Sequence, residues 1–297
     1  MSLYQFEYAY HKQEGFQMEL QSDWLQILTS CIDNVKKRVC PLLKTLREPQ
    51  PDLGKGAGSD AMKPVDLAAE KAIVETLRQS GVSFTLVSEE SGVQAFGETS
   101  RQCYVTVDPI DGTTNLVRGL PFYASSIAVS AEPVLSSVYA GLVADLAHDT
   151  VYFAQRGKGA YRDGKKIVAS QLAVLDEAVV GLDLNTFRVK EVVPRLTRLI
   201  EVAGHIRHFG ANALELCYVA EGLTEAFVDI RGKLRTTDMA AGFLIIREAG
   251  GLITMPEGEA LDATLDPRQK VKFVASGNPK IHKAILSLIG SEKEVRC

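Results

Sequence analysis

The stretch VTVDPIDGTTNLVRG, residues 105–119, places two aspartates three positions apart, directly after a short apolar run. Asp108 and Asp111 enclose a Pro-Ile pair. Carboxylates this close together at the end of a strand repel each other unless a cation lies between them, and Mg²⁺ prefers such oxygen ligands. The backbone carbonyl of Ile110 offers a further oxygen. Taken alone, the pattern fits either a metal site or a turn with an N-capping aspartate.

The next residues, Gly112-Thr113-Thr114, are predicted to open a helix or a tight turn. Free amide groups and the positive end of a helix dipole favour an anion at such a point. A phosphate group could therefore dock beside the paired aspartates.

Acidic residues recur in segments that lie far from this stretch in the sequence. Glu89-Glu90 follow an apolar run in LVSEESG (86–92), and Asp238 stands in TTDMAAG (236–242), where we expect it to be a helix N-cap. Asp60 and Asp66 lie in the glycine-rich segment GKGAGSDAMKPVD (54–66). Each segment alone also fits a solvated turn, a simple cap or a flexible loop. A metal site that uses two ions would need several of these carboxylates together.

Composition narrows the class of protein. The 297 residues are 46% hydrophobic and 24% charged, with a net charge of −4, which is ordinary for a globular enzyme. There is no basic run, so nucleic acid is not an expected partner. No apolar stretch reaches the roughly 18 residues that a membrane span needs. The five cysteines show no C-x-x-C spacing, so we expect reduced thiols and a cytoplasmic location.

Periodicity predicts an α+β first part, residues 18–173, and an α/β second part, residues 174–297. The first part should hold two amphipathic helices, two short strands and then an antiparallel meander, over residues 20–46, 65–79, 84–87, 105–107 and 125–169. Strands and helices alternate beyond residue 176 and end in a helix over 279–288.

In combination, the acidic segments resemble a known family. SEES, DPIDGTT and TDMAAG occur in the order that is the hallmark of the inositol monophosphatase superfamily of Mg²⁺-dependent, lithium-sensitive phosphatases. The sequence is most similar to the archaeal branch that acts on fructose 1,6-bisphosphate as well as inositol phosphates, because DIR (229–231) precedes the last aspartate. The resemblance implies a layered αβαβα sandwich and a homodimer.

The resemblance also implies roles for individual residues. Two or three Mg²⁺ ions, with Mn²⁺ as an alternative, would be held by Glu89, Asp108, the Ile110 carbonyl, Asp111 and Asp238, and Glu90 would hold the weaker third ion through water. The catalytic residues would be Asp66, Thr113 and Glu89. Asp66 would accept the proton of the Thr113 hydroxyl, so that this pair orients and deprotonates a metal-bound water. The substrate would be bound by Asp111, Gly112, Thr113, Thr114, Arg207, Asp229 and Arg231.

Some positions depart from the family pattern. Thr237 stands where many relatives have tryptophan, and Met62-Lys63 replace a Val-Thr pair in the glycine-rich segment. Arg207 and Arg231 could each hold a second phosphate through two parallel hydrogen bonds, or could form surface ion pairs.

These features leave several functions open. The first is a phosphomonoesterase that acts on fructose 1,6-bisphosphate, inositol 1-phosphate or both. The second is a 3'(2'),5'-bisphosphate nucleotidase or an NADP phosphatase, but we see no aromatic cluster near Asp229 or Gly210 that would stack on a base. The third is a protein-binding regulator with weak phosphatase activity, and the intact acidic residues argue against lost catalysis.

Overall fold

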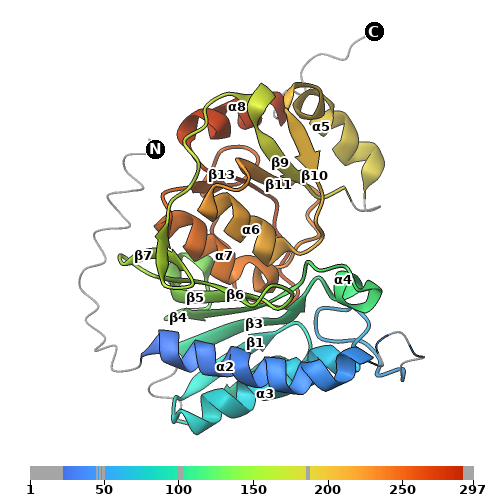
Figure 1. Cartoon of the computed structure of the whole chain (residues 1–297), viewed down its shortest axis with the longest axis vertical. Helices are drawn as coiled ribbons and strands as arrows, with labels where there is room; N and C mark the ends of the chain where they lie inside the picture. Colours follow the sequence, from blue (N-terminus) through green and yellow to red (C-terminus); the bar gives the residue numbers. More distant parts are fainter. Residues whose placement is uncertain are drawn as a thin grey trace.

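The computed structural model describes residues 23–44, 46, 48, 51–98, 103–184 and 188–289. Helices and sheets alternate in five layers (Figure 1). Helices α2 and α3 cover one face of an eight-stranded sheet, α6 and α7 lie between this sheet and a five-stranded sheet, and α5 and α8 cover the far side. The layered αβαβα sandwich expected from the sequence is confirmed.

The outer helices of the first layer are α2 (Trp24–Val39) and α3 (Pro64–Gln79). One face of α2 is apolar and packs against the sheet and α3; Leu28, Ile32 and Val35 are buried there and Ile27 is partly buried. The helix predicted over 20–46 ends earlier, at Val39, and a 3-10 turn, η1 (Cys40–Lys44), follows. Pro41 explains the early end, because its ring clashes with the preceding turn of an α-helix and it has no N–H to donate. Residues 20–22 and 45 of that prediction lie outside the described residues.

The eight-stranded sheet has the order β2-β1-β3-β4-β5-β6-β7-β8. β1 and β3 are parallel, the other neighbours are antiparallel, and the meander predicted over 125–169 is confirmed. β2 was not predicted, and β3 is longer than its predicted core of 105–107. The strands are β1 (Phe84–Ser88), β2 (Gly92–Phe96), β3 (Cys103–Asp111), β4 (Ala124–Ser130), β5 (Val138–Asp145), β6 (Thr150–Gln155), β7 (Gly159–Arg162) and β8 (Lys165–Ile167).

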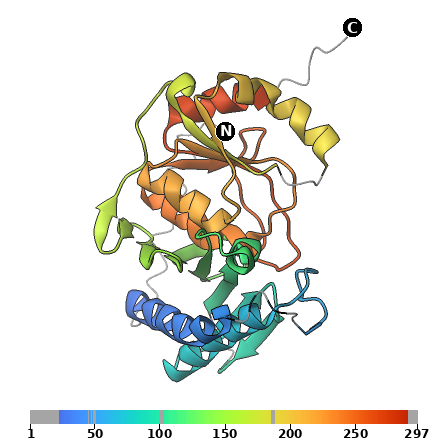
Figure 2. The ribbon, with the colours of Figure 1, turned by 45° about the vertical axis from the view of Figure 1, so that its right-hand side comes forward.

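The five-stranded sheet has the order β10-β9-β11-β13-β12 and carries helices on both faces. Figure 2 shows α5 and α8 on the side of this sheet that faces away from α6 and α7. The strand–helix alternation predicted beyond residue 176 is confirmed. The elements are β9 (Val179–Leu182), α5 (Val189–Val202), β10 (His205–Arg207), α6 (Asn212–Glu221), β11 (Ala226–Asp229), α7 (Thr236–Glu248), β12 (Leu252–Thr254), β13 (Phe273–Ser276) and α8 (Pro279–Ile289); η3 (Leu135–Ser137) and η4 (Leu175–Glu177) are short 3-10 turns. The domain boundary near 173 stays a prediction.

The central helix α7 is buried around its whole circumference, since every residue from Thr236 to Ile246 is buried. Small residues at its contacts allow α7 to fit between the two sheets. A Cβ at Gly141 of β5 would lie 3.1 Å from the Ala241 Cα, and one at Gly242 would lie 2.7 Å from a Leu216 side-chain carbon of α6. The close backbone approach expected from the Ala-Ala-Gly segment therefore fixes the height of α7 above the first sheet.

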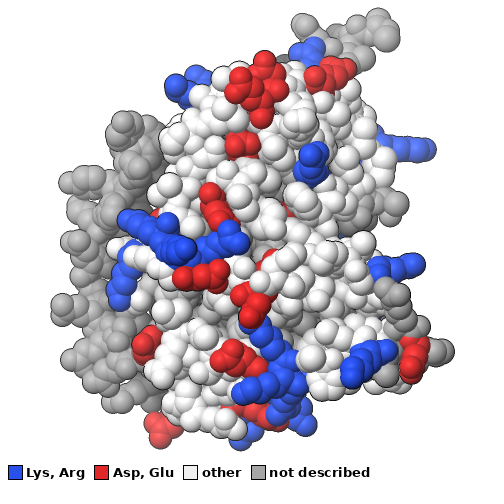
Figure 3. All heavy atoms as spheres, in the orientation of Figure 1, with Lys and Arg blue, Asp and Glu red and all other residues white. Residues whose placement is uncertain are grey.

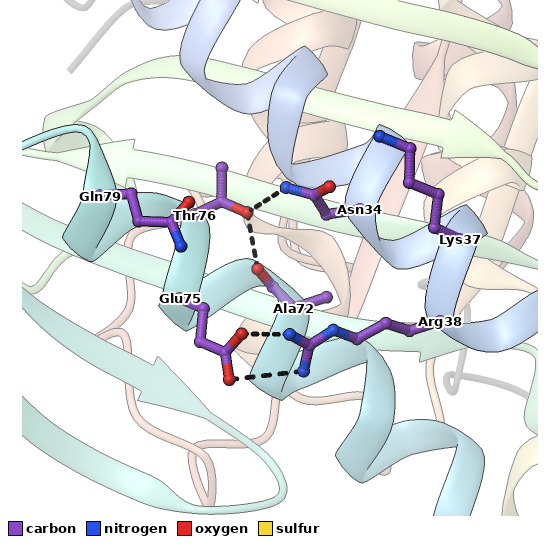
Figure 4. A pocket seen from close by; sticks show the side chains of 7 residues that line it. All are labelled: Asn34, Lys37, Arg38, Ala72, Glu75, Thr76 and Gln79. Atoms are coloured by element: carbon purple, nitrogen blue, oxygen red, sulfur yellow. Dashed lines mark hydrogen bonds and ion pairs between the residues drawn. The ribbon is translucent and has the colours of Figure 1, made fainter.

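A polar pocket lies on the outer surface between α2 and α3 (Figure 4). Its side chains already satisfy one another: Asn34 Nδ2 donates to Thr76 Oγ1 at 2.9 Å, and Arg38 pairs with Glu75. The pocket shares no residue with the acidic segments and holds no feature of a catalytic site. It is lined by Asn34, Lys37, Arg38, Ala72, Glu75, Thr76 and Gln79.

No helix within the described part of the chain is both long and apolar enough to cross a membrane. Cys31, Cys40, Cys103 and Cys217 are free thiols, as the spacing predicted, and Cys297 lies outside the described residues.

Candidate active site

The carboxyl ends of β1 and β3 bring the first two acidic residues together. Because these strands pair in parallel with Ser88 opposite Val107, the residues that follow, Glu89 and Asp108, come to the same edge of the sheet. Asp238 is placed above them by the first turn of α7. Glu89, Asp108 and Asp238 offer carboxylate oxygens that all lie within 4.8 Å of one another. These residues, named the acidic cluster below, were all recognised from the sequence.

Asp238 reaches the acidic cluster from a different helix position than expected. The predicted N-cap was wrong: α7 begins at Thr236, the N-cap is Arg235, and Asp238 is the third helical residue. Its Oδ2 accepts a hydrogen bond from the Arg235 backbone N–H at 3.2 Å, and its Oδ1 accepts one from the Thr237 hydroxyl at 2.9 Å. An acidic residue at the third position commonly reaches back to the N-cap amide in this way. Thr237 thus orients the aspartate through its hydroxyl.

Asp111 lies beyond an irregularity in β3. The register with β4 shifts between Asp108 and Asp111, so this carboxylate leaves the strand pattern. It accepts hydrogen bonds from the Asn212 N–H at 3.0 Å and the Ala213 N–H at 2.6 Å, at the start of α6. An aspartate distant in sequence therefore caps α6, a role that sequence reasoning did not predict. Each oxygen keeps a further lone pair that can bind a cation.

The turn after Asp111 requires glycine. Gly112 has a φ of 81° and is the N-cap of the short helix α4 (Thr113–Arg118). A Cβ at this position would lie 2.9 Å from the Ala211 Cβ. The predicted helix start is confirmed. Thr113 is half-buried and Thr114 is exposed, so both are at least partly open to solvent.

Burial and mutual repulsion raise the pKa values of the acidic residues. Burial is the main cause for Asp108 and Glu89, whose pKa values are well above the usual range, and neighbouring carboxylates raise them further. The pKa of Asp111 is raised to about 7 by burial and by the charge of Asp238. The pKa of Glu90 is also raised to about 7, by burial and by Asp66. A group of carboxylates that disfavours its own ionisation is a strong site for a cation.

The donor set fits a hard divalent cation. All three members of the acidic cluster supply oxygen, which suits Mg²⁺ or Mn²⁺ rather than a thiolate-seeking metal. The Asp108 Oδ1 atom is buried and has no hydrogen-bond partner among the described residues. An unsatisfied buried carboxylate oxygen costs free energy that a bound cation would recover.

Asp66 and Thr113 form the pair that the resemblance implied. The Thr113 hydroxyl lies 3.3 Å from Asp66 Oδ1 and 2.9 Å from the Ile110 carbonyl oxygen. Asp66 is in the first turn of α3, and burial raises its pKa to about 7. The hydroxyl thus lies between a carboxylate and the carbonyl predicted as a ligand, and their catalytic and metal-binding roles stay predictions.

Arg235 is a site residue that sequence reasoning missed. Its Nη1 donates to Glu89 Oε2 at 2.7 Å and its Nη2 to the Gly58 carbonyl at 2.8 Å, and it pairs with Asp60. The only sequence signal was an arginine three residues before Asp238. No spacing rule connects that position with Glu89 or Asp60, which lie 146 and 175 residues away.

The residues predicted to bind a second phosphate separate into different environments. Arg231 is buried, with a side chain 3% exposed, and pairs with Asp183 and Asp229 at the ends of β9 and β11. Arg207 is exposed on β10 and donates to the Ile206 carbonyl at 2.9 Å. Arg231 thus forms a buried ion pair instead of the surface pair considered from the sequence. The substrate-binding roles of Arg207, Asp229 and Arg231 stay predictions.

An aromatic cluster does lie beside Gly210, contrary to expectation. Phe209 stacks on Phe122 with ring centroids 4.8 Å apart, and Tyr218 meets the edges of both rings at 5.9 and 5.3 Å. Asn115 Nδ2 donates to the carbonyls of Phe122 and Phe209 and so holds their segments together. The sequence did not indicate this cluster because its members are up to 96 positions apart and meet only in the folded chain, where Asn115 bonds to both segments.

The fold and the acidic cluster define a metal-dependent phosphatase. The sequence profile described as the inositol monophosphatase family matches residues 24–294. The chain belongs to this family, whose members are metal-dependent, and it is a phosphoric ester hydrolase.

Individual relatives agree with this assignment. The chain is 34% identical over 275 residues to the fructose-1,6-bisphosphatase/inositol-1-monophosphatase of Methanothermobacter thermautotrophicus, covering 90% of this chain and 96% of that protein. It is 30% identical to the bifunctional NADP phosphatase/NAD kinase of Methanococcus maripaludis, covering 92% of this chain but 50% of that protein. A crystal structure of an inositol monophosphatase–fructose 1,6-bisphosphatase superposes with a TM-score of 0.79 at 28% identity, covering 90% of this chain and all of that one.

Proposed function

We propose that this protein is a Mg²⁺-dependent phosphomonoesterase that hydrolyses a small sugar or inositol phosphate, fructose 1,6-bisphosphate, inositol 1-phosphate or both. The observation that carries the proposal is the acidic cluster. Its three carboxylates come from the turn after β1, from β3 and from α7, and their oxygens lie within 4.8 Å of one another. The name of the Methanothermobacter relative supports the same substrates.

Residues of this chain would hold two or three Mg²⁺ ions. Glu89, Asp108 and Asp238 are the principal ligands, and Asp111 and the Ile110 carbonyl complete the set. Bound Mg²⁺ would neutralise phosphate charge and lower the pKa of a coordinated water. The amides of Gly112 and Thr113 and the hydroxyl of Thr114 would orient the phosphate beside the cluster.

Asp66 and Thr113 would take up the proton that the attacking water loses. A threonine hydroxyl is a poor base by itself, but Thr113 can accept a proton from water while it donates its own to Asp66. The pKa of Asp66, raised to about 7, places this carboxylate near the pH at which it can take up and release a proton. Attack of water on phosphorus then needs no covalent intermediate with a side chain.

The test is phosphate release from four compounds: fructose 1,6-bisphosphate, inositol 1-phosphate, adenosine 3',5'-bisphosphate and NADP. Each is assayed with Mg²⁺, with Mn²⁺, with added Li⁺ and after chelation. We expect turnover of the first two compounds, loss of activity on chelation and inhibition by Li⁺. No turnover of any compound would contradict the proposal and favour the protein-binding regulator.

A nucleotide substrate is the second candidate, and the aromatic cluster favours it. Phe209 lies next to Gly210, close to the predicted phosphate site, and offers a ring that a base could contact. Base–aromatic stacking contributes about 1–3 kcal/mol. Replacing Phe209 with Leu should then lower kcat/KM for NADP and adenosine 3',5'-bisphosphate about tenfold and leave inositol 1-phosphate nearly unchanged. An equal effect on all substrates would mean that the cluster only packs the fold.

A small metabolite is the partner we propose, in preference to nucleic acid or membrane. Charges of both signs are interspersed over the face shown in Figure 3, in keeping with the net charge of −4. We propose a homodimer on the family resemblance and a cytoplasmic location on the unpaired cysteines of the sequence. Light scattering coupled to size exclusion tests the first, with a mass near 32.3 kDa contradicting it.

A further inference from the structure

Arg235 lies where three separate parts of the site meet. Its backbone N–H binds Asp238 of α7, its Nη1 binds Glu89 after β1, and its Nη2 binds the Gly58 carbonyl of residues 54–61, named the glycine loop below. The same Nη2 atom pairs with Asp60 of this loop. One side chain therefore joins the acidic cluster to a loop that is distant in sequence.

The glycine loop is shaped to fit this guanidinium. Its backbone lies on the Glu89–Glu90 turn, since the Gly58 N–H donates to the Glu89 carbonyl at 2.7 Å. A Cβ at Gly58 would lie 2.8 Å from Arg235 Nε, and a Cβ at Gly56 would lie 2.7 Å from the Glu89 carbonyl oxygen. The loop packs this closely only because both positions are glycine, and its position depends on where the Arg235 side chain lies.

The charge of Arg235 is retained in this place. Its side chain is 11% exposed, and its Nε is buried without a hydrogen-bond partner among the residues that the structure describes. An arginine guanidinium stays protonated in proteins, and this one is held by the carboxylates of Asp60 and Glu89. A fixed positive charge thus touches a carboxylate that the proposed function assigns to Mg²⁺. Two cations that share one carboxylate repel each other.

We propose that Arg235 is an internal counter-cation that competes with the divalent cation for Glu89 and, through Gly58 and Asp60, couples cation binding to release of the glycine loop. This inference rests on the proposed function, because it takes the acidic cluster as the cation site. Arg235 is then a positioning residue: it weakens cation binding and holds the loop closed until a cation displaces its bond to Glu89.

The first test measures cation affinity without substrate. Mn²⁺ is titrated by calorimetry into the wild-type protein and into R235Q, and we expect R235Q to bind on the order of tenfold more tightly because a like charge is removed. R268Q is the matched control, since Arg268 Nε contacts the Ala57 carbonyl of the same loop at 3.4 Å. Its affinity should equal that of the wild type. Weaker binding by R235Q would overturn the inference and make Arg235 a residue that orients Glu89 toward the cation, since losing such a partner typically costs 10- to 100-fold in affinity.

The second test follows the loop by trypsin cleavage after the exposed Lys55. We expect Mn²⁺ to accelerate cleavage of the wild type, and R235Q to be cleaved rapidly with or without Mn²⁺. R235K retains the charge but cannot reach Glu89, Gly58 and Asp60 together, so it should keep wild-type affinity and lose protection of the loop. If R235Q does not fold, cleavage of R235K that still depends on Mn²⁺ as in the wild type overturns the coupling. Absence of Mn²⁺ binding by the wild type would overturn the proposed function as well, whereas wild-type binding with no gain in R235Q overturns this inference alone.

Discussion

The acidic cluster of Glu89, Asp108 and Asp238 differs from the acidic pair Asp183 and Asp229 in the origin of its counter-charge. Both groups include residues at or near the ends of strands, and both are largely buried. The pair holds the guanidinium of Arg231 from within the chain, with Nη2 2.7 Å from Asp229 Oδ2 and Nε 3.0 Å from Asp229 Oδ1. The cluster is contacted by Arg235 only at Glu89 and Asp238 and leaves the Asp108 Oδ1 atom unsatisfied within the described structure.

This difference shows how aspartate and arginine side chains can either stabilise the fold or form a binding site. Where an arginine bonds to every carboxylate of a group, as Arg231 does in this matched pair, the group stabilises the fold and cannot easily bind anything else. Where one carboxylate keeps an oxygen without a partner, as Asp108 does in the described structure, the pKa values rise and the fold keeps a site that an external cation can complete. The predictions below test this distinction.

The largest expected effect is on catalysis by the acidic cluster. D108N should lower kcat/KM by roughly 10³-fold or more, about 4 kcal/mol, because the neutral amide cannot hold the cation that offsets developing charge. The metal-free variant should also unfold at higher urea concentration than the wild type, because repulsion from Glu89 and Asp111 is removed. D149N is the control, since Asp149 is exposed and pairs with Lys36. Activity within tenfold of the wild type would exclude Asp108 from the site.

The second effect is on stability of the internally matched pair. R231L should lower the free energy of unfolding by about 3–4 kcal/mol, because it leaves Asp183 and Asp229 buried without their cation. The value is toward the lower end of the usual range, since the backbone N–H of residue 231 still donates to Asp229 Oδ1 at 2.9 Å. R207L, at an exposed arginine, should change stability by less than about 0.5 kcal/mol. Equal losses in the two variants would show that Arg231 contributes no more than a surface charge.

The contrast also explains what the sequence could reveal. The acidic cluster was predictable because its residues follow apolar strands or begin a helix, and because SEES, DPIDGTT and TDMAAG occur in the order of a known family. The parallel pairing of β1 and β3, which brings the ends of both strands to one edge, is seen only in the structure. Arg235 and the Asp183 contact of Arg231 were not predictable, because each depends on how the layers pack. Asp238 was predicted as the N-cap because its neighbours suggested a later helix start, whereas Thr236 already has helical geometry.

The third effect concerns His282, a buried histidine of α8 whose ring bonds to side chains of the five-stranded sheet. His282 Nε2 lies 2.9 Å from the Thr254 hydroxyl, which itself donates to the Met255 carbonyl, so the ring donates there, while Nδ1 accepts from Ser276 Oγ at 2.8 Å. Burial lowers the pKa of His282 to about 4. The unfolded chain therefore takes up the proton first, and stability falls as pH decreases from about 6.5 to 4, by up to about 3 kcal/mol.

The measurement is the difference in unfolding free energy between the wild type and H282Q at several pH values. Because both proteins share every other titrating group, the difference isolates His282. We expect the unfolding free energy of the wild type to decrease relative to that of H282Q as the pH falls. A difference that does not vary with pH would contradict a neutral buried ring.

The smallest effect returns to the acidic cluster. Mg²⁺ at one hundred times its dissociation constant should stabilise the wild type by about 2.7 kcal/mol and should not stabilise D108N. This stabilisation at a fixed Mg²⁺ concentration should increase as pH rises through about 7, because Asp66, Asp111 and Glu90 then lose the protons that compete with the cation. R231L offers the decisive comparison: it should be less stable throughout but should gain as much from Mg²⁺ as the wild type. If its gain were smaller, the matched pair and the acidic cluster would be energetically coupled, and the separation of a structural from a catalytic acidic group would fail.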